Sequence, residues 1–406
     1  MSKKDANIKT SISDYAPKTS FNFHKLEIPF SVEENITPIG LDIGYSSTKV
    51  SSMQGNYLFP SLPVRVMEDF SLIVDDNSIR YRDEEGNIWY VGDLARSILD
   101  SRQILTQTNT LYSSQRVMSK EYLILLRVGI FFGLIKKEEE DEFVLSLPSK
   151  IKVKTGLPEQ YIDRDRERLK ERFIGHHYFE IKVGDRKWQK VSFDIEEGDI
   201  SVISQPFGTL WSLVANRQGE IVDENLLKKE VLIYDGGQQT ADTYYNKSGL
   251  KGDNSTWETL SMLAVIRDVK RSVNKATKGM ANFEDYEFDK LITADIPGEL
   301  TYGRANYYNF SSDILDSTEK VAKEAMYELD VVYDYLNAID VLILTGGTGL
   351  AFYEYFKKYY DLPRLEVRLA EKKNSENPAE NFNAIQANAV GFLNCLVAEL
   401  KHQFNS

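Results

Sequence analysis

The stretch "YDGGQQTAD" at residues 234–242 combines two acids, two glycines and a threonine directly after an apolar run at 231–233. An aliphatic run that ends in Gly-Gly predicts a buried strand that turns sharply. Backbone N–H groups in such a turn can hold an anion, because glycine lets a ligand approach the main chain. A carboxylate beside the turn, at Asp235, would hold Mg²⁺ through water, since Mg²⁺ usually keeps several waters in proteins.

A similar stretch, "LDIGYSSTK", occupies residues 41–49. Asp42 ends an apolar strand, Gly44 lets the backbone close on a ligand, and Lys49 supplies a compact positive charge for β- and γ-phosphates. Hydroxyl groups that can donate to phosphate oxygens come from Ser46, Ser47 and Thr48. The spacing differs from a Walker loop, which needs G-x-x-x-x-G-K-[ST], and no such string occurs in the sequence. The alternative interpretation is a surface hairpin with a charged rim.

A third glycine-bearing turn, "TGGTG" at 345–349, also follows an apolar strand. Gly346 and Gly347, ahead of a helix expected from Leu350, suit adenine and ribose or an α-phosphate lying against backbone near a helix N-terminus. A helix cap is the alternative for this turn taken alone.

The order and separation of the three turns are more informative than any one of them. Together they predict a nucleotide held between two domains. Asp42 and Asp235 are then expected to face each other across a cleft and to hold Mg²⁺ through its water shell.

Strand-like and helix-like segments alternate along the rest of the chain. The pattern predicts a β-hairpin at 39–53, a strand leading into a helix at 88–99, a helix at 119–135, a buried strand at 142–149, an amphipathic helix at 163–175, a strand, turn and helix at 198–216, a second hairpin from 230, helices around 255–276 and 317–336, a strand, turn and helix at 340–360, and a terminal helical region at 378–404. Mixed hairpins and strand–helix units indicate α/β layers in two halves.

Composition sets further bounds on the function. A chain of 406 residues is long enough for two domains, and its net charge of −13 disfavours direct binding to nucleic acid. The single cysteine, Cys395, cannot form an intrachain disulfide, and the four histidines show no zinc-binding spacing. The most apolar window, 122–135, is too short for a membrane span and contains Arg127, so it predicts a buried helix. With no signal peptide apparent, we expect a cytoplasmic protein without a membrane partner.

The order "LDIGYSSTK", "ISQPFGT", "LIYDGGQQTAD", "LILTGGTG" and "IQANAVGF" resembles the phosphate-1, connect-1, phosphate-2, adenosine and connect-2 motifs of the actin-like ATPase superfamily. Within it the sequence is similar to plasmid-segregating bacterial actins of the ParM type, over roughly residues 38–400. The resemblance implies an actin-like fold of two ribonuclease-H-like α/β domains around a central nucleotide cleft. Domain I would span 38–229, joined by the returning C-terminal helix at 378–406, and domain II would span 230–377. Residues 1–37 would be an extension, either flexible, docked on the body or engaged in assembly.

The resemblance also implies roles for individual residues. Gln205 falls where the family orients the attacking water, and Asp235 and Asp242 would assist it. The residues expected to bind ATP or GTP are Asp42, Gly44, Ser46, Ser47, Thr48, Lys49, Gly236, Gly237, Gln238, Thr240, Gly346, Gly347, Thr348 and Gly349. Two alternatives remain at this stage: Gln205 as a cap of the Pro206 turn, and Asp242 as the partner of a nearby lysine.

The activity implied is nucleotide hydrolysis coupled to filament assembly, with plasmid DNA moved through a DNA-binding adaptor. One departure from the family pattern is Gln238, which stands where a small residue is usual and puts the shape of the second loop in question. A sugar or metabolite kinase with the same cleft and a non-hydrolysing actin-like scaffold are the alternative functions.

Overall fold

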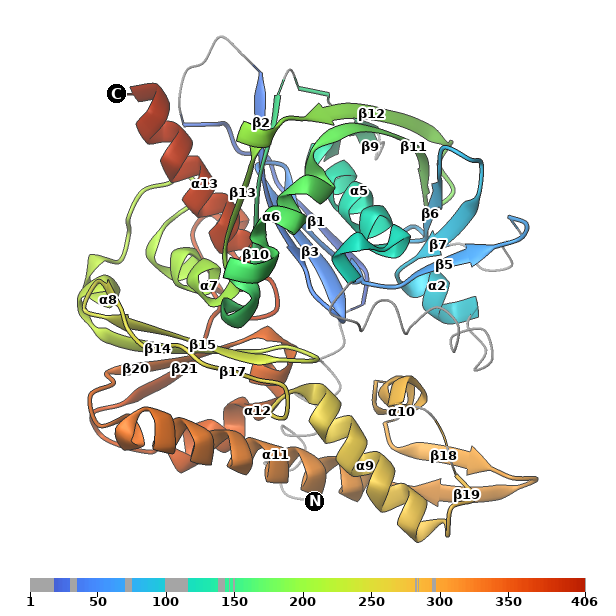
Figure 1. Ribbon diagram of the computed structural model, residues 1–406, viewed down its shortest axis with the longest axis vertical. Helices are drawn as coiled ribbons and strands as arrows, with labels where there is room; N and C mark the ends of the chain where they lie inside the picture. The colour runs from blue at the N-terminus through green and yellow to red at the C-terminus, as the bar shows by residue number, and fades with distance from the viewer. Residues whose placement is uncertain are drawn as a thin grey trace. The chain divides into compact units, whose positions relative to one another are not determined.

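The computed structural model describes residues 18–29, 35–69, 75–98, 116–137, 143–145, 147–148, 150–281, 283, 285–293 and 297–405. The described chain divides into two compact units. The first unit consists of the stretches 17–223 and 371–406, and the second unit contains residues 224–370. Each is built around a mixed sheet with helices packed against it (Figure 1).

The core sheet of the first unit has six strands. Its order is β1 (Ser20–Phe23), β4 (Gly55–Pro60), β3 (Ser47–Ser52), β2 (Ile36–Ile43), β10 (Lys150–Leu157) and β13 (Ile200–Ser204). The candidate site lies at the ends of three of these strands, β2, β3 and β13. β2, β3 and β4 form an antiparallel meander, whereas β2, β10 and β13 run parallel to one another. Parallel neighbours bring the ends of β2 and β13 to the same edge of the sheet, and this places Asp42 near Gln205.

Helices cover both faces of this sheet. The helices of the first unit are α2 (Asp93–Ile98), α5 (Lys120–Leu134), α6 (Ile162–Phe173), α7 (Gln205–Val214) and α13 (Ala387–Asn405). A Cβ on Gly129 of α5 would lie 2.7 Å from Leu41, and a Cβ on Gly40 would lie 2.1 Å from the Ala389 carbonyl oxygen of α13. Successive strand residues point to opposite faces, so α5 and α13 pack closely on opposite sides of β2.

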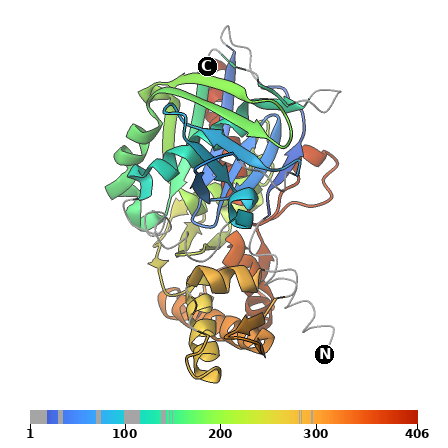
Figure 2. The same cartoon turned by 90° about the vertical axis from the view of Figure 1, so that its right-hand side faces the viewer.

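A second, peripheral sheet lies beyond α5 in the same unit (Figures 1 and 2). Its antiparallel order is β12 (Gln189–Ile195), β11 (Gly175–Val183), β6 (Ile79–Arg82), β7 (Ile88–Val91) and β5 (Pro63–Val66). A short pair, β8 (Ile135–Lys137) and β9 (Phe143–Leu145), follows α5. The buried side chains of both sheets and of α5 form one hydrophobic cluster.

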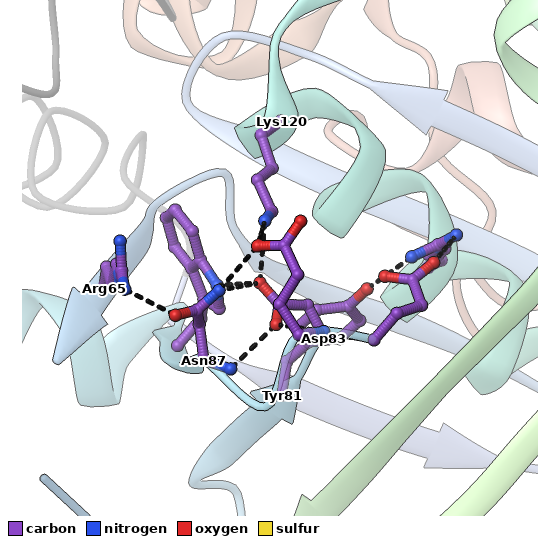
Figure 3. A network of polar contacts seen from close by, with 9 residues as sticks. Arg65, Tyr81, Asp83, Asn87 and Lys120 are labelled. Atoms are coloured by element: carbon purple, nitrogen blue, oxygen red, sulfur yellow. Dashed lines mark hydrogen bonds and ion pairs between the residues drawn. The ribbon is translucent and has the colours of Figure 1, made fainter. Parts of the chain in front are cut away.

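Charged contacts fasten the start of α5 to the β6–β7 turn (Figure 3). Lys120 Nζ lies 2.8 Å from Asp83 Oδ2 and 2.9 Å from Glu85 Oε2. The buried Asp83 carboxylate also accepts hydrogen bonds from Asn87 and from the Trp89 indole. A buried carboxylate needs several such donors to offset its lost hydration.

The second unit repeats the strand order of the first. Its sheet runs β16 (Leu250–Lys251), β15 (Ala241–Lys247), β14 (Glu230–Gly236), β20 (Val341–Thr345) and β21 (Glu366–Leu369), with β17 (Thr256–Trp257) also paired to β15. In each unit an antiparallel hairpin, β2–β3 or β14–β15, is followed by strands parallel to its first member. The other described elements of the second unit are α8 (Glu224–Lys228), α9 (Met262–Ala276), α10 (Asp285–Ile292), α11 (Ser311–Val332), α12 (Gly346–Tyr359), the hairpin β18 (Glu299–Tyr302) and β19 (Asn306–Asn309), and the 3₁₀ turn η4 (Asp334–Leu336). The first unit also contains the short 3₁₀ turns η1 (Arg116–Met118), η2 (Glu159–Tyr161), η3 (Glu197–Asp199) and η5 (Pro378–Glu380).

Most predicted elements are confirmed, including the hairpin at 39–53 and the buried helix at 119–135. The strand predicted at 142–149 is wrong in extent, because β9 covers Phe143–Leu145 and residues 147–148 are not strand. Within the described part of the chain β9 pairs with β8. The sequence pattern missed the neighbouring core strand β10, in which three lysines alternate with other residues. Lys154, nearly fully buried, lies 2.8 Å from Glu399 of α13, and Lys152 lies 2.9 Å from Asp199. Such long-range pairing lets a strand carry charge inside the fold.

The described part of the N-terminal segment docks on the first unit. β1 pairs antiparallel with β4, and Leu26 and Ile28 pack against a cluster that contains Leu393, Leu396 and Val397 of α13. Residues 1–17 of the expected extension lie outside the described residues. None of the helices in the described part of the chain combines the length and the apolar composition that crossing a membrane requires.

Candidate functional site

Asp42 is the central charged group of the first loop. It faces Lys49 across the β2–β3 hairpin and is only 2% exposed, so its carboxylate depends on protein partners for compensation. Lys49 Nζ lies 3.2 Å from Asp42 Oδ2, and Gln205 donates from Nε2 to Oδ1 over 3.0 Å. Each carboxylate oxygen keeps further lone pairs, and this suits contact with a metal through water.

Gln205 is the first residue of α7, immediately after β13. Its amide reaches Asp42 rather than capping the Pro206 turn. The neighbouring strand has Gly156 at this point, where a Cβ would lie 3.0 Å from Gln205 Cγ. The fold therefore brings together three of the predicted side chains: Asp42, Lys49 and Gln205.

Hydrogen bonds shape the backbone of the first loop. The Gly44 N–H donates to the Ser47 carbonyl over 3.0 Å, and a Cβ on Gly44 would lie 2.8 Å from Lys49 Nζ. The Thr48 hydroxyl, fully buried, is engaged with the Ser61 hydroxyl at 3.0 Å, so it supports the loop from within. Ser47 Oγ is also buried, but it has no hydrogen-bond partner among the described residues. The loop thus offers a close backbone approach and an uncommitted hydroxyl.

The second loop joins β14 to β15 in a tight hairpin. Asp235 and Asp242 are directly opposite, and the Gly237 N–H donates to the Thr240 carbonyl over 2.8 Å. Asp242 accepts hydrogen bonds from the Thr240 hydroxyl at 3.0 Å and from the Thr256 hydroxyl. Two hydroxyl groups therefore hold the Asp242 carboxylate.

Carbonyls of the second loop face the start of α9. The Met262 and Leu263 N–H groups donate to the carbonyls of Gly237 and Gln238 over 3.3 and 2.9 Å, which occupies N–H groups in the first turn of the helix. The Thr348 hydroxyl donates to the Gly237 carbonyl over 2.6 Å. The Gln238 side chain is 9% exposed, and its Oε1 has no hydrogen-bond partner in the described structure.

The third turn differs from its prediction and packs against the second loop. α12 begins at Gly346 rather than at Leu350, so the glycines form its first turn. Gly346 has φ +77°, where a Cβ would lie 2.3 Å from the Gly236 carbonyl oxygen and 2.9 Å from Asp235 Oδ1. Only glycine accommodates both this conformation and this close approach. Asp235 consequently lies beside the N-terminus of α12.

One polar residue next to the first loop was missed by the sequence analysis. Arg116 of η1 donates from Nη2 to the Ile43 carbonyl, and its guanidinium lies 3.9 Å from the centroid of the Tyr45 ring. It also lies 5.4 Å from the ring of buried Tyr122, whose pKa is raised to about 12 by burial. No local motif surrounds Arg116, so only the folded chain connects it with the loop.

The residues present fit a nucleoside triphosphate and a hydrated Mg²⁺. In the first loop, the close backbone approach at Gly44 and the buried Ser47 hydroxyl suit phosphate oxygens, and Lys49 provides a cation. Asp42 carries hard oxygen atoms of the kind that Mg²⁺ prefers, and the second unit has a loop carboxylate of its own at Asp235. Among the described residues, no group of three or more His, Cys, Asp or Glu side chains is arranged to bind a metal directly.

Comparison with known proteins finds a family match over the part of the chain that contains the first loop and Gln205. Residues 40–208 match the family model described as "Actin like proteins N terminal domain". No curated protein shows significant sequence similarity to the chain.

Solved structures share the fold over about nine tenths of the chain. The non-polymerisable quadruple mutant of pCBH ParM and the 15-stranded ParM filament from Clostridium botulinum each have TM-score 0.67 and 20% identity, covering 91% of this chain and 100% of theirs. The archaeal actin homologue Ta0583 has TM-score 0.61 and 15% identity, covering 89% of this chain and 99% of its own. Actin-like folds generally bind nucleotide together with Mg²⁺. Residues 40–208 therefore resemble an actin-like N-terminal domain, and the chain shares the actin-like two-domain fold of the ParM structures.

Proposed function

We propose that this protein is a cytoplasmic, nucleotide-dependent polymerising ATPase or GTPase of the bacterial actin type. The observation that carries the proposal is the convergence of Lys49, Asp42 and Gln205 on one loop, from segments that are distant in sequence. Phosphoryl transfer to water needs alignment and charge neutralisation more than covalent help, and these residue types supply both.

Roles follow from the chemistry of each group. Lys49 and the glycine-bearing loops bind the phosphates, and Gln205 holds the attacking water, because an amide can orient water but is too weak a base to deprotonate it. Asp235 and Asp242 would assist in orienting water, and Asp42 and Asp235 are the carboxylates that would hold Mg²⁺, through its water molecules. Bound Mg²⁺ would neutralise negative charge on the phosphates.

Self-association into filaments is the second part of the proposal. One ParM of the same fold forms a 15-stranded filament, and Alp12, at 17% identity and TM-score 0.55, is also solved as a filament. A head-to-tail contact that does not close generates such an open assembly. Plasmid segregation would require a DNA-binding adaptor, because a net charge of −13 opposes direct contact with DNA.

The experiment is to add ATP or GTP with Mg²⁺ to the full chain and to follow light scattering and phosphate release together. Scattering that rises with nucleotide and decays after phosphate release supports the proposal, and chelation of Mg²⁺ should suppress both signals. Assembly without phosphate release would indicate a scaffold. Phosphate transfer to a sugar without assembly would indicate a kinase, and either result would overturn the proposed function.

A further inference from the structure

Arg116 contacts the first loop at the peptide that joins Ile43 to Gly44. The Ile43 carbonyl, which accepts from Arg116, belongs to the same peptide unit as the Gly44 N–H, which donates to the Ser47 carbonyl. A peptide unit is planar, so fixing the directions of its C=O and N–H groups fixes the plane. The Ile43–Gly44 peptide is therefore held from both sides.

The Tyr45 ring forms the other half of the contact. The Arg116 guanidinium lies 3.9 Å from its centroid, well within the range of roughly 6 Å at which a cation is attracted to an aromatic face. Arg116 thus grips the residues on both sides of Gly44, which otherwise has the largest conformational freedom in the loop. Arg116 also lies directly before α5, whose N-cap Ser119 accepts from the Tyr122 N–H, so the arginine is anchored to a rigid element.

We propose that Arg116 is a positioning residue for phosphate binding, which fixes the Ile43–Gly44 peptide and the Tyr45 ring so that the first loop is shaped before the nucleotide arrives. This inference rests on the proposed nucleotide site and goes beyond it, because Arg116 acts through the loop rather than on the phosphate. Ordering a loop in advance removes an entropic cost from binding.

Alanine and lysine substitutions of Arg116 separate this role from a simple charge effect. Lysine keeps the positive charge but lacks the planar guanidinium that stacks on Tyr45 while donating to a carbonyl. We expect Arg116→Ala and Arg116→Lys each to weaken nucleotide binding about tenfold, equivalent to ~1.4 kcal/mol. The measurement is titration of nucleotide-free protein with a fluorescent ATP or GTP analogue and Mg²⁺ at constant salt.

Two further variants test whether Arg116 acts on the loop through its contact with Tyr45. Tyr45→Ala should weaken binding to a similar extent, and Arg116→Ala added to it should cost less than threefold more, about 0.7 kcal/mol, because contacting residues are not additive. Arg186→Ala is the matched control. Arg186 lies 3.8 Å from the Phe143 ring and donates to the Val183 carbonyl, so it loses the same kinds of contact outside the loop and should bind nucleotide like the wild type.

Hydrogen exchange in the nucleotide-free protein gives a readout that does not depend on the ligand. Both Arg116 variants should speed amide exchange in residues 43–49 while leaving the midpoint of thermal unfolding no lower than that of Arg186→Ala. Wild-type affinity in Arg116→Lys, or multiplicative losses in the double variant, would overturn the positioning role. Failure of the wild type to bind any nucleotide would instead overturn the proposed function. In that case, unchanged amide exchange at residues 43–49 in the Arg116 variants would still refute the positioning role of Arg116.

Discussion

Gln205 donates a hydrogen bond to Asp42 over 3.0 Å, although 163 residues separate the two in the sequence. Gln205 starts α7 directly after β13, and Asp42 lies near the end of β2. In the sheet, β10 lies between these two strands. The contact ties the residue assigned to the attacking water to the residue assigned to hydrated Mg²⁺. The direct hydrogen bond therefore fixes the orientation of the Gln205 amide.

Removal of the Gln205 amide should slow hydrolysis without preventing assembly. For Gln205→Ala we expect phosphate release to fall by roughly 10²-fold, the cost that misplacing a reacting group can carry, while light scattering still rises with nucleotide. Filaments should then persist longer than those of the wild type. Unchanged phosphate release and filament lifetime would remove Gln205 from the mechanism.

Lys49→Ala should weaken nucleotide binding and leave the Asp42 carboxylate with one partner fewer. We expect affinity to drop at least about tenfold, since the variant loses a cation next to the phosphates, and the loss should shrink as salt is raised. Lys152→Ala is a suitable control, because Lys152 pairs with Asp199 in the same sheet without contacting the loop. Equal affinities in the two variants, measured by nucleotide titration, would contradict the role of Lys49.

Gly346→Ala and Gly349→Ala should shift stability in opposite directions. A methyl group at Gly346 would meet the Gly236 carbonyl and force alanine into a left-handed conformation, so we expect a loss of about 1–3 kcal/mol. At Gly349, inside α12, the nearest atoms to a new Cβ lie 3.5 Å away, and alanine should stabilise the helix by up to about 1 kcal/mol. Thermal unfolding measures both variants. A Gly346→Ala protein as stable as the wild type would be inconsistent with the packing of the second loop on α12.

Lowering the pH should reveal how much the Asp83 carboxylate (Figure 3) contributes to the stability of the fold. Burial alone would raise the pKa of this carboxyl, but hydrogen bonds from Lys120, Asn87 and Trp89 outweigh it and lower the pKa from 3.8 to about 2. A carboxyl with a lowered pKa stabilises the fold above its unfolded pKa, and this stabilisation is lost as pH falls toward the folded value. The difference in unfolding midpoint between the wild type and Asp83→Asn should therefore shrink between about pH 4 and pH 2. Parallel profiles over that range would exclude the effect, and Lys120→Met should move the loss to higher pH.

Sequence analysis succeeded where one short segment carries its own signal. An apolar run followed by glycine and an acid predicted the hairpins at Asp42 and Asp235, because strand alternation and sharp turns are local properties. It failed for β10, where Lys154 looks like a surface residue until Glu399 of α13 is placed beside it. It also misplaced the start of α12, because a glycine pair can end a turn or begin a helix with equal local preference.

The sequence by itself determined the three loops, the α/β class and the resemblance to actin-like proteins, since each is encoded in neighbouring residues. Tertiary structure alone decided that Gln205 and Lys49 both meet Asp42, that Thr48 turns inward to Ser61, and that Arg116 grips the loop at Ile43 and Tyr45. The physical reason is that these contacts join segments brought together only by parallel strand pairing and by the packing of α5 between two sheets. Pairing of that kind depends on the whole core, and no local pattern specifies it.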